Sequence, residues 1–118
     1  MSALETVRAA SGLDAYLDAV EEGLEAAVAA HPGLVERIGR EALSAGGKRL
    51  RPALAFLCAP AGAPPPVAEG VAVELVHTAT LVHDDLIDGA RVRRGQAAAW
   101  SEHGAAAARA GGDYLFAR

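Results

Sequence analysis

Apolar residues recur every three or four positions in the first quarter of the chain, and this spacing constrains its fold more than any other feature. The series is Leu13, Leu17, Val20, Leu24 and Val28. Such spacing places side chains on one face of an α-helix, and acidic residues fall largely on the opposite face. Aromatic residues, which favour strands, make up only 4% of the sequence. The pattern therefore predicts an all-α fold.

Prolines and glycines mark the ends of the predicted helices. The first helix should end at the His-Pro-Gly sequence of residues 31–33, because proline disfavours helical geometry in the residue before it. Pro52 suits the first turn of another helix. A basic loop after Gly89 leads to a weak helical segment. The further main helices are expected over residues 34–43, 52–59, 67–88 and 105–118.

Charge and hydropathy exclude several kinds of partner. The net charge is −4, from 11 basic and 15 acidic residues, whereas nucleic-acid binding requires a basic face. The most apolar stretch, residues 52–68, is interrupted by prolines and lacks the roughly 20 uninterrupted apolar residues of a membrane span. The first residues show no signal-peptide pattern. We therefore expect a cytoplasmic protein that does not bind nucleic acid and has no membrane span.

For three single residues, we expect a place in the folded structure and no part in a functional site. Cys58 is the one cysteine of the sequence, so no disulfide can form within the chain, which fits a reducing compartment. Its apolar neighbours indicate a small core residue. We expect Trp100 in the core or at an interface, and His103 at the surface.

Three carboxylates gather at the end of the long predicted helix. Asp84, Asp85 and Asp88 are three or four residues apart, so all three can lie near one side of a helical turn. They repel one another and lie where the helix dipole disfavours negative charge. His77 is two turns earlier on the face of Asp84. The cluster indicates a site for Mg²⁺, which prefers oxygen ligands. The alternative is a solvated acidic helix end.

Two basic clusters flank this acidic motif. The first follows two glycines, and the members of both are Lys48, Arg49 and Arg51, then Arg91, Arg93 and Arg94. Glycine lets backbone N–H groups approach an anion, and lysine and arginine donate hydrogen bonds to phosphate oxygens. The spacing of a P-loop is absent. A solvated basic turn is the alternative for the first cluster alone, but together the clusters predict binding of a diphosphate through Mg²⁺.

Four segments resemble motifs of the trans-isoprenyl diphosphate synthases, or polyprenyl synthetases. They are GGKRLRP at residues 46–52, ELVHTATLVHDDLID at 74–88, RRG at 93–95 and GDYL at 112–115. Their order and spacing match those of the family. The resemblance implies that residues 1–118 form the N-terminal portion of an isoprenoid-synthase helical bundle around a central cavity. It also implies a homodimer for the full domain.

The resemblance assigns roles to nine residues. It implies that Asp84 and Asp88 ligate Mg²⁺ on an allylic diphosphate, with Asp85 supporting them. Arg93 would contact the same diphosphate. Isopentenyl diphosphate would be bound by Gly47, Lys48, Arg51, His77 and Arg94. The implied activity is that of a prenyltransferase in isoprenoid biosynthesis, in which Mg²⁺ stabilises the departing diphosphate and the double bond of isopentenyl diphosphate attacks the carbocation.

The sequence departs from the family after its RRG segment, where Pro-Thr is missing, and in its second motif, and two alternatives stay open. The second aspartate-rich motif of the family is absent from these 118 residues. A non-catalytic truncated synthase or interaction module is therefore one alternative. The other is an HD-type metal phosphohydrolase with ligands His77, His83, Asp84 and Asp113. The two histidines, however, are six residues apart, about 240° around a helix, which makes a shared metal difficult.

Overall fold

Helices make up most of the computed structural model, which describes residues 12–117 except residues 46–47, 61 and 94. Within this part, the helices are α2 (Leu13–Ala29), α3 (Leu34–Ala45), α4 (Leu50–Cys58), α5 (Val67–Asp88), α6 (Ala99–His103) and α7 (Ala105–Ala117). The prediction of an all-α fold is confirmed. The sequence did not predict the short antiparallel hairpin of β1 (Val92–Arg93) and β2 (Gln96–Ala97), which lies in the expected basic loop.

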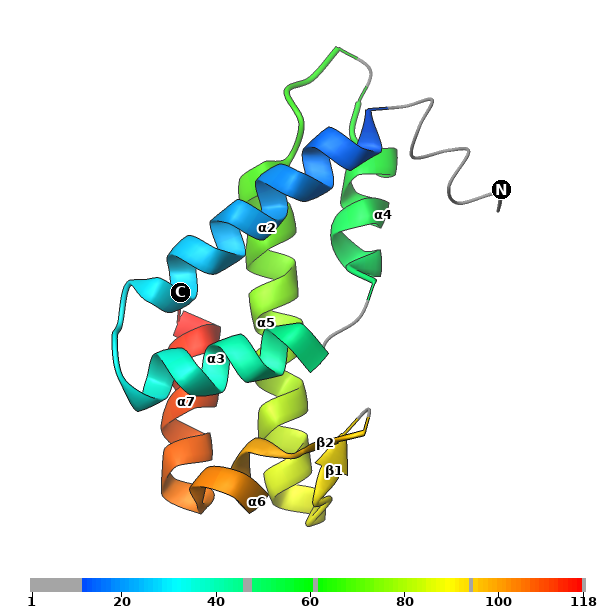
Figure 1. The fold of residues 1–118 in the computed structure, drawn as a ribbon. Coiled ribbons are helices and arrows are strands. Elements are labelled where there is room, and N and C mark those ends of the chain that lie inside the picture. Colours follow the sequence, from blue (N-terminus) through cyan, green and yellow to red (C-terminus); the bar gives the residue numbers. More distant parts are fainter. Residues whose placement is uncertain (1–11, 46–47, 61, 94, 118) are drawn as a thin grey trace.

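The long helix α5 is the central element of the fold. It contacts α2 and α4 in its first half and α7 along its second half, while α3 crosses in front of it (Figure 1). The hairpin and α6 lie at the C-terminal end of α5. The segments that follow α5 in the chain therefore fold back around its end, where the three aspartates are.

The apolar face predicted for the first helix forms much of the core. All five residues of the series are buried, and they pack with Leu75 and Ala79 of α5 and with Leu115 of α7. Burial of such side chains contributes on the order of 2 kcal/mol each to folding, before the entropy cost of ordering them. The spacing in the sequence therefore identified the correct helix face.

Tyr16 joins three segments near the start of α5. Its hydroxyl is 2.9 Å from the carbonyl oxygen of Pro52 and 3.2 Å from that of Pro66, and can donate to either. Its ring packs against Phe56, with the ring centroids 4.8 Å apart. Burial, with a smaller contribution from the negative charge of Glu69, raises the pKa of Tyr16 above its ordinary value. The neutral phenol is therefore the form that the fold favours.

Glycines allow α3 to pack closely against both α7 and α2. A Cβ atom added at Gly111 would lie 2.7 Å from Cγ2 of Ile38, and one added at Gly39 would lie 2.8 Å from Cγ1 of Val28. Both glycines are buried inside helices. The helices therefore approach more closely at these positions than any side chain would allow, a feature that apolar periodicity does not reveal.

Two of the single-residue interpretations are wrong. Cys58 is exposed rather than part of the core, because α4 turns Pro52 and Ala53 inward and leaves its last two residues in solvent. His103 is not a surface residue, since its side chain is only 9% exposed. Trp100 is half-buried, and its indole N–H donates a hydrogen bond of 2.6 Å to the carbonyl of Ala90.

Among the described residues, no helix combines the length and the apolar character that crossing a lipid bilayer requires.

Candidate functional site

The three aspartates at the end of α5 face two directions. Asp84 and Asp88 are exposed, whereas Asp85 is buried, with 4% of its surface accessible. Successive residues of a helix are about 100° apart, so a residue next to Asp84 points elsewhere. Asp85 therefore lies at the buried edge of the cluster, although the charges of all three carboxylates act on Arg93. Asp84 and Asp88 remain a pair of exposed carboxylates one turn apart.

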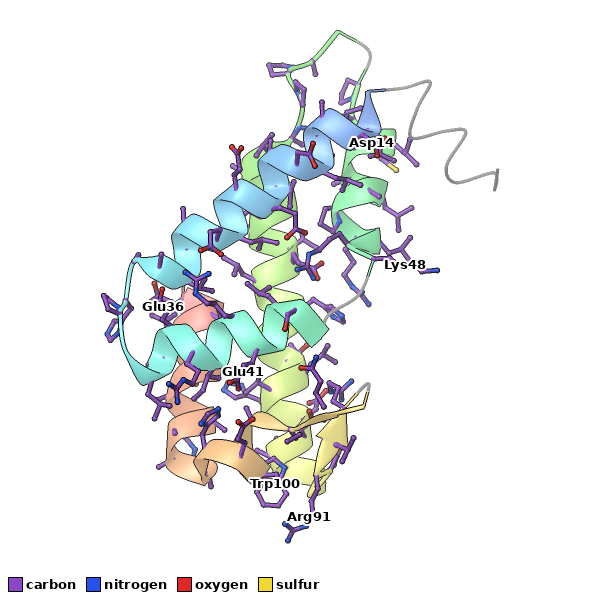
Figure 2. The ribbon with its side chains drawn as sticks, viewed as in Figure 1. Asp14, Glu36, Glu41, Lys48, Arg91 and Trp100 are labelled. Carbon is purple, nitrogen blue, oxygen red and sulfur yellow. The ribbon has the colours of Figure 1, made fainter. Side chains whose placement is uncertain are left out.

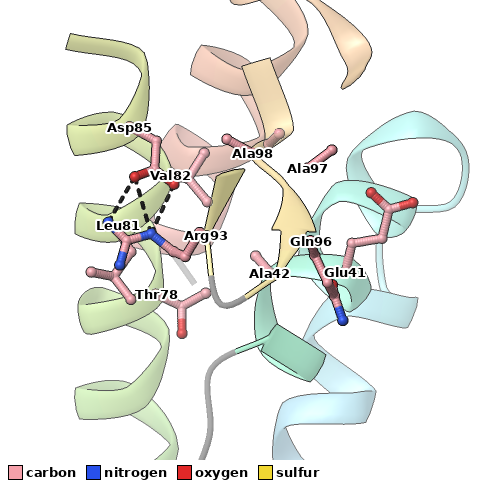
Figure 3. A pocket seen from close by; sticks show the side chains of 11 residues that line it. Glu41, Ala42, Thr78, Leu81, Val82, Asp85, Arg93, Gln96, Ala97 and Ala98 are labelled. Atoms are coloured by element: carbon pink, nitrogen blue, oxygen red, sulfur yellow. Dashed lines mark hydrogen bonds and ion pairs between the residues drawn. The ribbon is translucent and has the colours of Figure 1, made fainter. Parts of the chain in front are cut away.

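Asp85 is paired with Arg93 of the hairpin. Nε of Arg93 donates to both carboxylate oxygens, at 3.0 and 2.8 Å, and Nη2 donates to Oδ1 at 2.7 Å (Figure 3). These hydrogen bonds raise the pKa of Arg93 above its ordinary value, the partial burial of the group opposes the shift, and the charges of Asp84 and Asp88 add to it. Arg93 is therefore a permanent positive charge close to all three carboxylates.

A small cavity lies on the inner side of the Asp85–Arg93 pair. Its walls come from α5, from α3 and from the segment that joins the hairpin to α6 (Figure 3). Thr78 contributes a buried hydroxyl, which is the one buried side-chain polar atom without a hydrogen-bond partner among the described residues. Asp84 and Asp88 do not line this cavity. It is therefore separate from the surface that carries the exposed carboxylates.

The basic residues before and within the first turn of α4 also differ in exposure: some face solvent and one points inward. Lys48 and Arg51 are exposed, and Lys48 extends outward near the N-terminal end of α4 in Figure 2. Arg49 instead turns inward. Gly47 and Arg94, for which the resemblance implies contacts with isopentenyl diphosphate, lie outside the described residues. The described part of the first basic cluster thus offers two exposed cations.

His77 lies on α5 two turns before Asp84 and is half-buried. The hydroxyl of Thr80 donates a hydrogen bond of 2.6 Å to the carbonyl of His77. His77 is therefore on the same helix as the exposed carboxylates, seven residues before Asp84.

Sequence reasoning missed the partners of Arg49. The guanidinium contacts Glu21 of α2 and Glu74 of α5, and the Glu74 side chain is only 2% exposed. An acidic residue within an apolar run such as Val73–Val76 is a signal for a buried ion pair. That signal was present in the sequence.

His83 and Asp113, two of the residues named for the HD-type alternative, do come together. Nε2 of His83 lies 3.2 Å from Oδ1 of Asp113, so the pair joins α5 to α7. The imidazole also packs over Gly112, where an added Cβ would collide with the ring. This contact explains the two residues as part of the packing between the helices.

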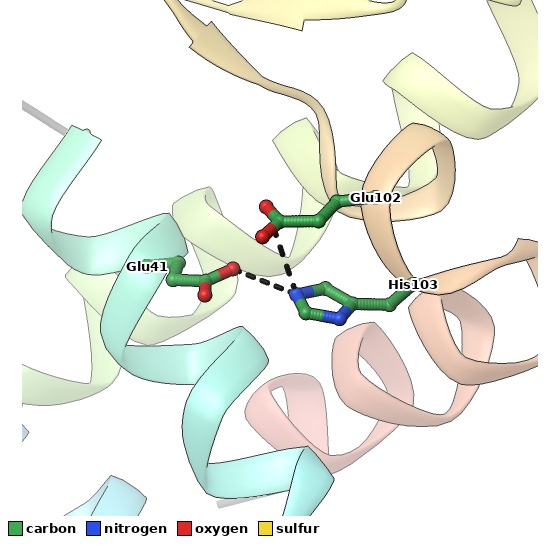
Figure 4. A group of neighbouring side chains, drawn as sticks. All are labelled: Glu41, Glu102 and His103. Atoms are coloured by element: carbon green, nitrogen blue, oxygen red, sulfur yellow. Dashed lines mark hydrogen bonds and ion pairs between the residues drawn. The ribbon is translucent and has the colours of Figure 1, made fainter.

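A second group of potential ligands lies between α3 and α6. One ligand atom each from Glu41, Glu102 and His103 lies within 4.8 Å of the others (Figure 4). Nε2 of His103 is 2.8 Å from Oε2 of Glu41 and 3.8 Å from Oε2 of Glu102. The pairing between His103 and Glu41 accounts for the proximity of these groups and links the two helices.

Known proteins share this fold and sequence. The sequence model of a family described as Polyprenyl synthetase matches residues 32–118. The heptaprenyl diphosphate synthase component 2 of Geobacillus stearothermophilus is 45% identical over 86% of the chain and 33% of its own length. The octaprenyl diphosphate synthase of Escherichia coli K12 is 40% identical over 72% of the chain and 27% of its own length.

Solved structures agree with these similarities. The heptaprenyl diphosphate synthase of Staphylococcus aureus superposes with a TM-score of 0.79 and 36% identity, over 88% of the chain and 34% of that protein. A decaprenyl diphosphate synthase of Rhodobacter capsulatus superposes with a TM-score of 0.77 and 36% identity, over 93% of the chain and 35% of that protein. The chain thus spans about a third of the length of the curated relatives it matches.

Proposed function

We propose, because this chain belongs to the polyprenyl synthetase family, that it supplies the diphosphate-binding part of a prenyltransferase. The reaction would condense isopentenyl diphosphate with an allylic diphosphate. The observation that carries the proposal is the exposed pair Asp84 and Asp88, with the permanently charged Arg93 beside it. The relatives named above are all prenyl diphosphate synthases, which favours this function over that of a phosphohydrolase.

The exposed pair fits a magnesium ion chemically. Two residues four positions apart are separated by about 6 Å along the helix axis and lie on the same side of the helix, so their carboxylate side chains can turn toward one ion, and Mg²⁺ commonly takes one or two carboxylates together with water and substrate phosphate. Asp85 is already paired with Arg93, so Asp84 and Asp88 would hold the ion. When bound, Mg²⁺ would neutralise the diphosphate and stabilise the charge that develops on it as it leaves.

The cationic side chains would orient the substrates. Arg93, fixed by its forked hydrogen bonds to Asp85, would direct its remaining N–H groups toward the allylic diphosphate. Lys48 and Arg51 would bind the diphosphate of isopentenyl diphosphate, with His77 nearby and with Gly47 and Arg94 as further proposed contacts. Holding the two substrates in one geometry lowers the entropy cost of the condensation. The homodimer implied for the full domain belongs to the same proposal.

Titration of the chain with inorganic diphosphate by isothermal titration calorimetry, with and without Mg²⁺, tests the site. Asp84→Asn with Asp88→Asn should weaken Mg²⁺-dependent binding at least about tenfold, because a charge-assisted contact contributes roughly 1.5–3 kcal/mol. The matched control is Asp18→Asn with Glu22→Gln, an exposed acidic pair four residues apart on α2. Equal binding by the wild-type chain and the Asp84/Asp88 variant would overturn the proposal.

A non-catalytic role is the second candidate function. The chain spans about a third of the length of the relatives and contains one aspartate-rich motif, at residues 84–88. Incubation with labelled isopentenyl diphosphate and an allylic diphosphate separates the two candidates. Chain-elongated product would support catalysis by this chain, whereas diphosphate binding without product would support the non-catalytic role.

A further inference from the structure

Arg49 has an unusual backbone conformation at the N-cap of α4. Its φ and ψ angles are 55° and 44°, in the left-handed region, and it is the one residue other than glycine with positive φ in the described part of the chain. For such a residue this conformation costs on the order of 1 kcal/mol, and it persists only where surrounding contacts impose it. The contacts of the side chain must therefore compensate for this cost.

The guanidinium of Arg49 supplies those contacts. Nε donates to Oε1 of Glu21 at 2.6 Å, Nη1 to Oε1 of Glu74 at 3.3 Å, and Nη2 to the carbonyl of Leu43 at 2.9 Å. These partners belong to α2, α5 and α3, and the Arg49 side chain is only 11% exposed. One side chain thus joins three helices to the residue where α4 begins.

The exposed cations of the proposed site lie one residue before Arg49 and two residues after it. Lys48 precedes it and Arg51 lies in the first turn of α4, and both side chains face solvent. The left-handed turn at Arg49 sets the direction in which the chain enters α4. Because the guanidinium fixes this turn, it also fixes the placement of Lys48 and Arg51.

We infer that Arg49 is a positioning residue for anion binding: its buried ion pairs hold the turn that presents Lys48 and Arg51 to a diphosphate. The inference rests on the function proposed above. It gives Arg49 a role different from that of its neighbours, since its own guanidinium is occupied by protein acceptors. Lysine could not replace it, because an ammonium group lacks the planar arrangement of donors that reaches three acceptors at once.

A double-mutant cycle distinguishes positioning from general stabilisation. Inorganic diphosphate is titrated into the wild-type chain, Arg49→Asn, Arg51→Gln and the double variant. Asparagine tolerates the left-handed conformation but cannot make the three contacts. Arg49→Asn should weaken binding roughly fivefold, and this effect should largely disappear in the Arg51→Gln background, because coupled residues do not contribute additively.

Two further variants keep the test independent of folding. Arg40→Asn is the matched control, because Arg40 also pairs with two carboxylates, Glu25 and Glu36, but on the exposed side of α3. It should leave binding unchanged. Glu74→Gln keeps an acceptor for Arg49 and should weaken binding in the same direction as Arg49→Asn, by a smaller factor. Circular dichroism of each variant verifies the helical fold.

The possible outcomes separate the two proposals. Binding by the wild-type chain, together with undiminished binding by Arg49→Asn and Glu74→Gln, would overturn the role of Arg49 and leave the proposed function standing. If Arg49→Asn reduces the affinity for diphosphate by the same factor in the wild-type and Arg51→Gln backgrounds, the positioning role of Arg49 is also overturned. A wild-type chain that binds no diphosphate with or without Mg²⁺ would overturn the proposed function and, with it, this inference.

Discussion

Asp85 and Glu74 are carboxylates that the chain buries on α5, and each meets an arginine from another segment. Arg93 pairs with Asp85, and Arg49 pairs with Glu74. A buried carboxylate without such a partner costs several kcal/mol, and arginine keeps its charge at any ordinary pH. These two pairs therefore place the hairpin and the start of α4 at defined points on α5, and so arrange the exposed charges around them.

Tyr16 gives the stability of the chain a dependence on alkaline pH. Its pKa is raised in the folded protein, above the value of about 10 in the unfolded chain. The neutral phenol therefore stabilises the fold fully below pH ~10, and this contribution is lost as the pH rises through the folded-state pKa. The free energy of unfolding, measured with urea between pH 8 and 11, should fall above pH ~10.

Tyr16→Phe is the comparison for this measurement. Phenylalanine keeps the ring that packs on Phe56 but has no ionisable group, so the decline with pH should be less steep than in the wild-type chain. If the free energy of unfolding falls with pH equally steeply in the two proteins, the titration of Tyr16 does not contribute to the pH dependence of stability. At neutral pH the variant should be about 1 kcal/mol less stable, because the hydrogen bonds of the hydroxyl are lost.

Helix packing in this protein depends on small residues as much as on large apolar ones. Gly39 and Gly111 lie where α3 meets α2 and α7, and the sequence pattern of large apolar residues does not identify such positions. Helix-forming tendency alone would favour alanine over glycine by about 1 kcal/mol. The retention of glycine is explained by the lack of space for a Cβ atom.

Gly111→Ala tests this account of the α3–α7 contact. The new methyl group would lie 2.7 Å from Cγ2 and 3.2 Å from Cβ of Ile38, and a β-branched side chain has little freedom to move away. We expect a net loss of stability of about 1–3 kcal/mol, measured by urea unfolding. The exposed neighbour provides the control, since Ala110→Ser should change stability by less than about 0.5 kcal/mol. A more stable Gly111→Ala protein would contradict the account.

Across the whole molecule, the sequence identified the helices better than it identified the contacts between them. The series beginning at Leu13 correctly marked a buried face, because helical periodicity is a local property. The direction of Arg49 was missed because its acidic partners lie 28 and 25 residues away, and that of Asp85 because its partner Arg93 belongs to a hairpin that the sequence did not predict. Cys58 and His103 were misplaced for the same reason: burial is decided by which helices meet, and composition does not contain that information.

The molecule as a whole also exposes apolar side chains in a stripe. Leu50, Leu54 and Leu57 lie along one face of α4 and are each about half exposed. Contiguous exposed apolar surface binds hydrophobic dyes. The chain should therefore enhance the fluorescence of 8-anilinonaphthalene-1-sulfonate, and Leu54→Gln with Leu57→Gln should reduce that signal about twofold or more. The control Ala68→Gln with Ala72→Gln, at exposed positions of α5, should leave it unchanged; equal signals from both variants would refute the assignment to α4.

The exposed thiol of Cys58 makes the chain open to distance measurements in solution. It is the one cysteine, and Trp100 is the one tryptophan, so a single acceptor dye attached to the thiol would form one donor–acceptor pair with the indole. The dye would sit at the end of α4 and the indole beside the hairpin. Energy transfer between them would follow the separation between the C-terminal end of α4 and the hairpin as ligand is added, without any substitution in the protein.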